Sequence, residues 1–129
     1  MTDYVVDACA WIEYFNGSDK GAAVRAIVES EKNKIVTNVI TIAEISSYFH
    51  KKGKEFSEAK KIIFALSTTF SPGAEFAAEA GALYVELRKN RKHIGLADVF
   101  VLLTARRVHA KVLTADQDFK GLKEVVLLK

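Results

Sequence analysis

The sequence has too little cysteine to form a disulfide framework or a cysteine-based zinc site. Cys9 is its only cysteine, and its three histidines stand far apart with no cysteine pair nearby. Proline is equally scarce, with Pro72 as the only one. No tract rich in proline, glycine or serine marks a linker. These absences, together with a length of 129 residues, predict one folded domain over residues 1–129.

Long hydrophobic runs are also missing. Residues 1–7 contain no basic segment followed by an apolar stretch, so they do not resemble a secretory signal. The apolar run over residues 99–105 is too short to span a bilayer. We therefore expect a cytoplasmic protein in a reducing environment, without membrane attachment.

Neither sign of charge dominates the sequence. The 19 basic and 16 acidic residues give a net charge of +3, which is compatible with a polyanionic partner but indicates none by itself. The distribution is more informative, because Arg88, Lys89, Arg91 and Lys92 form a dense basic run. Such a run is usually a solvated helix end, and phosphate binding is the alternative.

Short strand-like segments alternate with helical patterns along the whole chain. The strands are predicted at residues 3–6, 34–37, 68–70, 111–114 and 125–128, and the helices at 8–15, 20–31, 39–52, 57–66, 74–89, 96–108 and, as a short turn, 117–120. This alternation predicts an α/β fold, a three-layer α/β/α sandwich around a five-stranded parallel sheet. In such sheets ligands bind beyond the carboxyl ends of the strands.

Acidic residues fall at that edge of the predicted sheet. Asp7 ends the first strand, and Asp116 and Asp118 follow the fourth. Asp98 and Glu44 lie near the starts of two helices that face the same edge. Unpaired carboxylates that meet in one pocket need a cation to neutralise them, and oxygen ligands suit Mg²⁺ or Mn²⁺. Together with the lack of an obvious nucleophilic side chain, this pattern predicts metal-dependent phosphodiester hydrolysis.

Each of these acids also has an ordinary structural explanation. Asp7 and Asp116 have the side chain of an N-cap, Asp98 suits a helix N-terminus, and residues 41–44 fit a capping box if a helix begins at Thr41. The spacing alone leaves the capping interpretation and the metal interpretation open.

Residues 4–12, 41–45, 95–105 and 112–122 resemble the four acidic motifs of the PIN-domain family, in the same order. The resemblance implies that Asp7, Glu44, Asp98 and Asp116 form an acidic quartet that binds Mg²⁺ or Mn²⁺. It further implies that Asp118 assists as a metal ligand and that the hydroxyl of Thr114 supports the site. It also implies the strand order 3-2-1-4-5, a homodimer and an RNA substrate.

The short chain further resembles the VapC-type toxin ribonucleases of type II toxin–antitoxin systems. This resemblance implies that a small VapB-like antitoxin protein lies along the active-site groove, and that Arg88, Lys89, Arg91 and Lys92 contact phosphates at its mouth. The alternative is a non-catalytic PIN-fold module that only binds RNA or protein. A P-loop and a dinucleotide fingerprint are absent. A dehalogenase-type phosphatase would need an aspartate where Cys9 stands.

Overall fold

A parallel sheet of five strands forms the centre of the structure, a computed structural model that describes residues 2–129. The strands are β1 (Asp3–Val6), β2 (Lys34–Asn38), β3 (Thr68–Phe70), β4 (Lys111–Thr114) and β5 (Val125–Leu127). They lie in the order β3-β2-β1-β4-β5, and every neighbouring pair is parallel. The α/β fold and the implied strand order are therefore confirmed.

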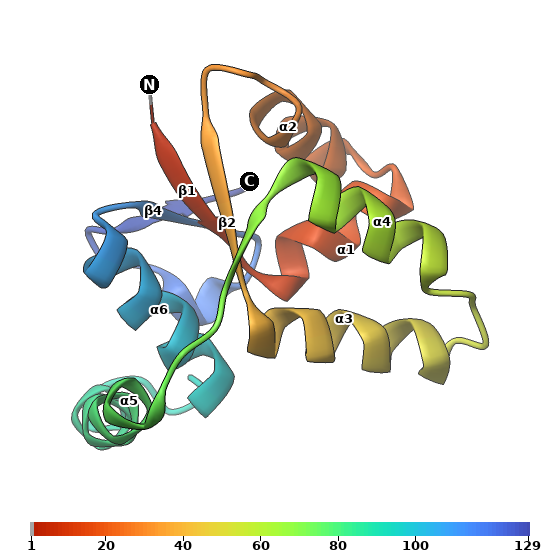
Figure 1. The fold of residues 1–129 in the computed structure, drawn as a ribbon. Helices are drawn as coiled ribbons and strands as arrows, with labels where there is room; N and C mark the ends of the chain where they lie inside the picture. The colour runs from red at the N-terminus through yellow and green to blue at the C-terminus, as the bar shows by residue number, and fades with distance from the viewer. Residues whose placement is uncertain (1) are drawn as a thin grey trace.

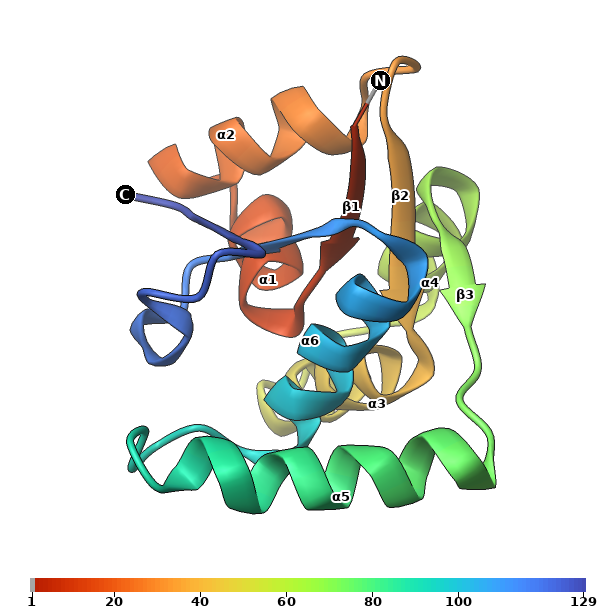
Figure 2. The ribbon, with the colours of Figure 1, turned by 90° about the vertical axis from the view of Figure 1, so that its left-hand side faces the viewer.

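Helices cover both faces of this sheet (Figures 1 and 2). On one face lie α1 (Ala8–Asn16), α2 (Asp19–Val28) and α4 (Ser57–Leu66), and on the other lies α6 (Leu96–Val108), against which α5 (Ala74–Arg88) packs. From the end of β2, α3 (Val39–Lys51) extends away from the sheet, and η1 (Gln117–Phe119) is one turn of 3₁₀ helix after β4. None of the helices in residues 2–129 is long and apolar enough to cross a membrane.

Alternating side chains of the central strands supply the two hydrophobic layers. Val6 and Leu113 point into the layer beside α1, whereas Val5 and Val112 point into the layer beside α6. This is the period of two that a strand imposes, and both faces are apolar because both are covered by helices. Trp11 is fully buried in the first layer.

Two predicted local features differ from the structure. The second helix ends at Val28 rather than at residue 31, because the backbone turns there and the carbonyl of Ile27 accepts the side-chain amide of Asn33 at 3.0 Å. The capping box that a helix start at Thr41 would allow does not form, because α3 begins at Val39, as predicted, with Asn38 as its N-cap. The hydroxyl of Thr41 is buried and finds no hydrogen-bond partner among the described residues.

Candidate metal centre

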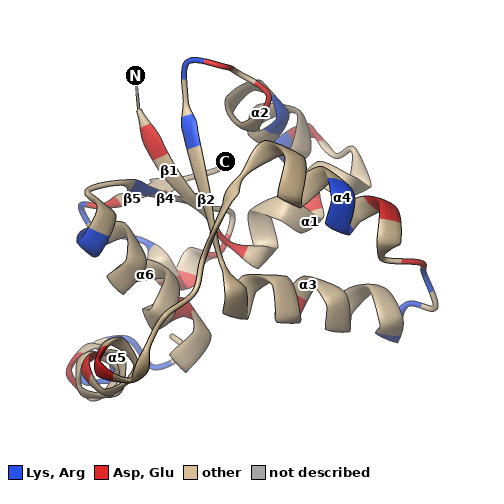
Figure 3. Ribbon diagram, viewed as in Figure 1, with Lys and Arg blue, Asp and Glu red and all other residues tan. Residues whose placement is uncertain are grey.

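The carboxyl-terminal edge of the sheet collects acidic residues from four separate parts of the chain. Asp7 directly follows β1, and Asp116 and Asp118 follow β4. Asp98 lies in the first turn of α6 and Glu44 in the second turn of α3. In the ribbon of Figure 3, positions of acidic residues, coloured red, lie at this end of the sheet, where β1 passes into α1 and beside α6. The parallel arrangement causes this, since every strand ends at the same edge.

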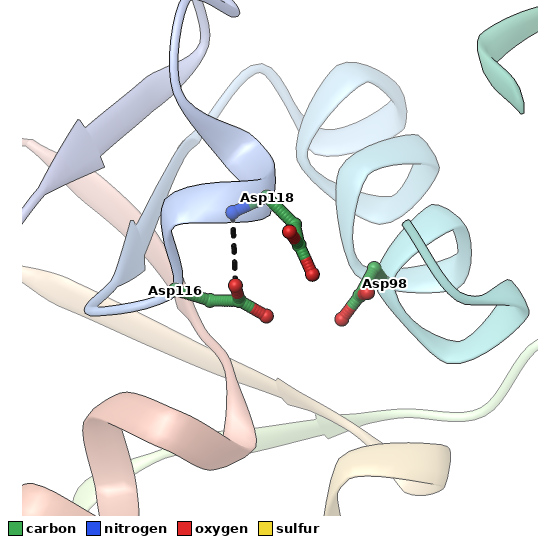
Figure 4. A group of neighbouring side chains, drawn as sticks. All are labelled: Asp98, Asp116 and Asp118. Carbon is green, nitrogen blue, oxygen red and sulfur yellow. Dashed lines mark hydrogen bonds between the residues drawn. The ribbon is translucent and has the colours of Figure 1, made fainter. Parts of the chain in front are cut away.

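Three of these carboxylates form a tight group. Asp98, Asp116 and Asp118 each offer an oxygen, and these oxygens all lie within 4.8 Å of one another. Figure 4 shows the three side chains pointing toward a common space, Asp98 from α6 and the other two from η1 and the turn before it. Backbone amides orient two of them: Asp118 donates its N–H to Asp116 Oδ1 at 2.9 Å, and Gly95 donates to Asp98 Oδ2 at 2.8 Å.

Asp7 lies deeper than this trio and is joined to it through Thr114. Its side chain is only 4% exposed, and Oδ1 accepts the N–H of Ala10 at 2.8 Å. The hydroxyl of Thr114 donates to Oδ2 of Asp7 in a short contact. The same hydroxyl accepts the N–H of Asp116 at 2.9 Å. Thr114 is fully buried and thus couples the ends of β1 and β4.

Burial and neighbouring carboxylates raise the pKa values of Asp7, Glu44 and Asp98. Burial is the main reason that the pKa of Asp7 rises from 3.8 to about 7; the hydrogen bonds from Thr114 and Ala10 oppose the rise, and Asp98 and Asp116 add to it. Partial burial and then Asp98 and Asp116 raise the pKa of Glu44. The pKa of Asp98 is raised by burial, with Asp116 and Asp118 adding to the effect. The ionised form of these three carboxyl groups is therefore unfavourable at this edge while no cation is bound.

No basic side chain neutralises this charge. Within residues 2–129, none of the five acids forms a salt bridge with a lysine, arginine or histidine. A cluster of carboxylates with raised pKa values and without a basic partner is unfavourable unless a cation joins it. Oxygen donors in this number fit Mg²⁺ or Mn²⁺, which take a few carboxylates together with water.

Capping and clustering both occur in the structure, because each carboxylate has two oxygens. Asp7 is the N-cap of α1 and Asp116 is the N-cap of η1. Asp98 and Asp116 each use one oxygen to accept a backbone N–H, and the other oxygen of each accepts no hydrogen bond from the described residues. Capping by Asp7 and Asp116 is therefore observed, and for Asp98 and Asp116 it leaves the second oxygen for a metal ion, whereas both oxygens of Asp7 already accept hydrogen bonds.

The structure brings three of the five predicted metal ligands into a tight group and leaves the other two outside it. The resemblance gave Asp118 the lesser role, yet it belongs to the tight trio, whereas Asp7 and Glu44 lie outside it. Glu44 is still close enough that Asp98 and Asp116 raise its pKa.

The comparisons with known proteins agree with this geometry. The sequence matches the PIN domain family over residues 4–125. The chain belongs to the PIN domain family. No curated protein matches the chain significantly.

Solved structures with the same fold include several toxin–antitoxin proteins. A toxin–antitoxin complex from Klebsiella pneumoniae is 23% identical, with 95% of each chain covered and a TM-score of 0.70. VapBC2 from Rickettsia felis, bound to a DNA fragment from its promoter, is 22% identical, with 98% of this chain and 97% of that one covered and a TM-score of 0.71. VapC20 from Mycobacterium tuberculosis, described as a toxin that cleaves the sarcin–ricin loop, is 15% identical, with coverage of 95% and 98% and a TM-score of 0.73. These similarities show a shared PIN fold.

The basic run of this PIN domain is largely engaged in structural contacts. Arg88 donates to the carbonyl of Ile94 at 3.1 Å, and Lys89 pairs with Glu86 at 3.2 Å. Arg91 donates to the backbone carbonyls of Asp118 and Lys120, so it is the member of the run that reaches the acidic edge. Lys92 is exposed and makes no hydrogen bond or salt bridge with the described residues. Phosphate contacts by the first three would therefore have to compete with existing bonds.

Asn38 is a site-forming residue that the sequence reasoning missed. It is fully buried, its Oδ1 accepts the N–H of Ile40 at 2.9 Å, and its Nδ2 donates to Thr104 Oγ1 at 2.8 Å. It therefore ties the start of α3, which carries Glu44, to α6, which carries Asp98. An asparagine between a strand and a helix is a typical N-cap and was visible in the sequence. Its bond to Thr104, 66 residues away, was not.

Proposed function

We propose that this PIN domain is a Mg²⁺- or Mn²⁺-dependent endoribonuclease, the toxin of a VapBC-type toxin–antitoxin pair. The observation that carries the proposal is the group of acids at the end of the sheet, three of them within 4.8 Å and none paired with a base in residues 2–129. Membership of a family whose proteins are generally metal-dependent nucleases supports the same activity.

In this proposal Asp98, Asp116 and Asp118 hold the ion directly, each through the oxygen that faces the shared space. Asp7 and Thr114 hold the turn after β4 in place, because the Thr114 hydroxyl bonds to both Asp7 and the N–H of Asp116. Glu44 stands on the rim, where its carboxylate is available to a metal-bound water or to the substrate. The ion, when bound, supplies an activated water and stabilises charge on the scissile phosphate.

No protein nucleophile is needed, and the nearest thiol is unsuited to that role. Burial, with the charges of Asp7 and Asp116, raises the pKa of Cys9 to about 11, so the thiol stays protonated near neutral pH. Water is therefore the nucleophile in the proposed hydrolysis. Its oxygen would form the new bond to phosphorus as the bond from phosphorus to the sugar oxygen breaks, and the proton that the water loses would be balanced by protonation of the leaving sugar oxygen.

The proposed substrate and partner are supported by the structural relatives, one of which is described as a toxin that cleaves the sarcin–ricin loop and another as a toxin–antitoxin complex. A cavity of about 540 Å³ between α1 and α3 begins at Glu44 and is lined in part by Ile12, Tyr48 and Lys51. A peptide segment of a small antitoxin that lies in this groove covers the acidic edge and blocks RNA. For the expected homodimer we propose the outer side of α5, where Val85 is 62% exposed.

A cleavage assay on purified protein tests the proposal. Structured and unstructured RNAs are incubated with Mg²⁺, with Mn²⁺ or with EDTA, using the wild type, Asp98→Asn and Asp116→Asn. Asp19→Asn is the matched control, because Asp19 is exposed in the first turn of α2 and lies outside the acidic group. We expect cleavage that needs the metal, survives in Asp19→Asn and falls at least about 100-fold in the other two variants.

The opposite outcome favours a non-catalytic binding module. RNA binding without metal-dependent cleavage, with the same behaviour in Asp98→Asn, Asp116→Asn and the wild type, would contradict the proposed activity. Circular dichroism of each variant shows that it is folded, so that loss of cleavage is assigned to the site.

A further inference from the structure

Arg91 connects two parts of the chain that are distant in sequence. It lies in the turn between α5 and α6 and is half-buried. Its Nη1 donates to the carbonyl of Asp118 at 3.1 Å and to the carbonyl of Lys120 at 2.6 Å. Residues 118–121 bend around the guanidinium: Gly121 has a φ of +92°, and a Cβ built there would lie 3.4 Å from Arg91 Nη2. A glycine suits both the positive φ and the close approach.

The guanidinium of Arg91 donates its hydrogen bonds to backbone oxygens rather than to a carboxylate. Within residues 2–129 Arg91 forms no salt bridge, unlike Arg106 and Arg107, which pair with Glu124 and Glu79. The acids of the candidate metal centre therefore have no ion pair with Arg91, although this cationic side chain lies next to Asp118. Arg91 bonds to the main chain of the segment that carries them.

The backbone of Asp118 is consequently held on both sides of its Cα. Its N–H donates to Asp116 Oδ1 at 2.9 Å, and its carbonyl accepts from Arg91. The helix η1 contains only three residues, too few to fix its own orientation by internal hydrogen bonds. The buried side chain of Phe119 packs into the hydrophobic core and anchors the turn there. The contacts from Arg91 fix the backbone on either side of that anchor.

We propose that Arg91 is a positioning residue that holds the segment 118–121 so that the carboxylate of Asp118 faces Asp98 and Asp116. This inference rests on the proposed metal-dependent function, since it assigns to Arg91 the support of the third metal ligand. Residues that orient metal ligands without touching the metal typically change metal affinity by roughly 10–100-fold when removed. We expect a loss of Mn²⁺ affinity in this range.

The sign of the change separates positioning from simple electrostatics. A positive charge near the site repels a divalent cation, so removal of that charge alone strengthens Mn²⁺ binding. Loss of the two carbonyl contacts frees Asp118 and weakens Mn²⁺ binding. Arg91→Met removes the charge and the donors together, and the positioning role predicts that the weakening dominates.

The test measures Mn²⁺ binding to the folded proteins by calorimetric titration, with free Mn²⁺ followed by electron paramagnetic resonance. Lys92→Met is the matched control, because it removes one positive charge from the same turn at a residue without contact to residues 118–121. We expect Arg91→Met to raise the Kd for Mn²⁺ by roughly 10–100-fold. Lys92→Met should leave the Kd unchanged or slightly lower. Arg91→Lys should fall between Arg91→Met and the wild type, because both carbonyl bonds come from one nitrogen, which the shorter lysine side chain supplies in part.

A second readout needs no metal. Amide hydrogen exchange in EDTA should show faster exchange at residues 117–121 in Arg91→Met than in the wild type, with the core strands β1 and β4 unchanged. This measurement also shows whether the variant is folded. A purely structural role predicts faster exchange throughout the protein and an unchanged Kd for the folded fraction.

The inference is overturned if Arg91→Met binds Mn²⁺ as tightly as the wild type or more tightly, or if exchange at residues 117–121 does not change. If the wild-type protein still cleaves RNA with Mn²⁺ in that case, the proposed function stands and only the role of Arg91 is refuted. If wild-type protein binds no Mn²⁺ and cleaves no RNA, the proposed function fails, and the role of Arg91 at the metal centre fails with it.

Discussion

Replacement of Asp7 by asparagine should make the metal-free protein more stable at alkaline pH. Asp7 is almost fully buried, and its pKa in the folded protein is about 7, against an ordinary value of 3.8. The folded state therefore favours the protonated carboxyl. Its contribution to stability is complete below the unfolded pKa and is lost as the pH rises through about 7. Asparagine stays neutral at every pH and avoids this loss.

The size of the effect follows from the two pKa values. A difference of about three pKa units corresponds to about 4 kcal/mol at a pH above both values. Asparagine keeps an oxygen that can accept the N–H of Ala10, so the N-cap of α1 is retained. Its amide cannot accept from the Thr114 hydroxyl at the second position, which costs about 1 kcal/mol. We therefore expect Asp7→Asn to gain about 3 kcal/mol at pH 8 and close to nothing, or a small loss, at pH 4.

Urea denaturation in EDTA at pH 4, 6 and 8 measures this difference, with Asp19→Asn as a control whose difference from the wild type should not depend on pH. The reasoning is refuted if Asp7→Asn is less stable than the wild type at pH 8, or if the difference is the same at pH 4 and pH 8. Either result would show that the hydrogen bonds to the Asp7 carboxylate stabilise its ionised form by more than burial and the neighbouring acids destabilise it.

Three further predictions concern the metal and the supports of the site. Saturating Mg²⁺ or Mn²⁺, at about 100 times its Kd, should stabilise the wild type by about 2.7 kcal/mol in thermal melts, and an equal gain in Asp116→Asn would argue against binding at this edge. Metal affinity, measured by titration, should fall as the pH drops through neutrality. Burial and neighbouring acids raise the pKa values of Asp7, Glu44 and Asp98, so protons then compete with the ion. An affinity that does not change between pH 5 and 8 contradicts this. Asn38→Ala should lower the free energy of unfolding by about 1–3 kcal/mol, since it removes the N-cap of α3 and leaves the Thr104 hydroxyl without its donor; unfolding at an unchanged urea concentration would show that these bonds contribute nothing.

Much of the fold was predictable because local signals and tertiary structure agree. The helices at 57–66 and 96–108 have the predicted bounds, since both follow polar or glycine-containing turns and carry clear helical periodicity. The expected end at residue 31 was wrong because the contact of Asn33 with Ile27 stops α2 earlier. The capping box at Thr41 does not form because Asn38, a better cap, lies three residues before it.

The sequence was enough to predict which edge of the sheet holds the candidate site. It was not enough to predict which side chains contact one another there. Parallel topology brings Asp7 and Asp116 to one edge of the sheet, which the sequence pattern implies, whereas the pairing of β1 with β4 was implied only by the family resemblance. The tighter grouping of Asp98 with Asp118 depends on the orientation of a three-residue helix. That orientation involves Arg91, which precedes Asp118 by 27 residues and belongs to a run that reads as a solvated helix end.

The most direct measurement of the central claim is a crystal structure with Mn²⁺, in which anomalous scattering locates the ion. The account predicts an anomalous peak within coordination distance of the carboxylates of Asp98, Asp116 and Asp118, and its disappearance in crystals of Asp116→Asn. A crystal with no peak at this edge, from protein that still cleaves RNA in the same Mn²⁺ solution, contradicts it.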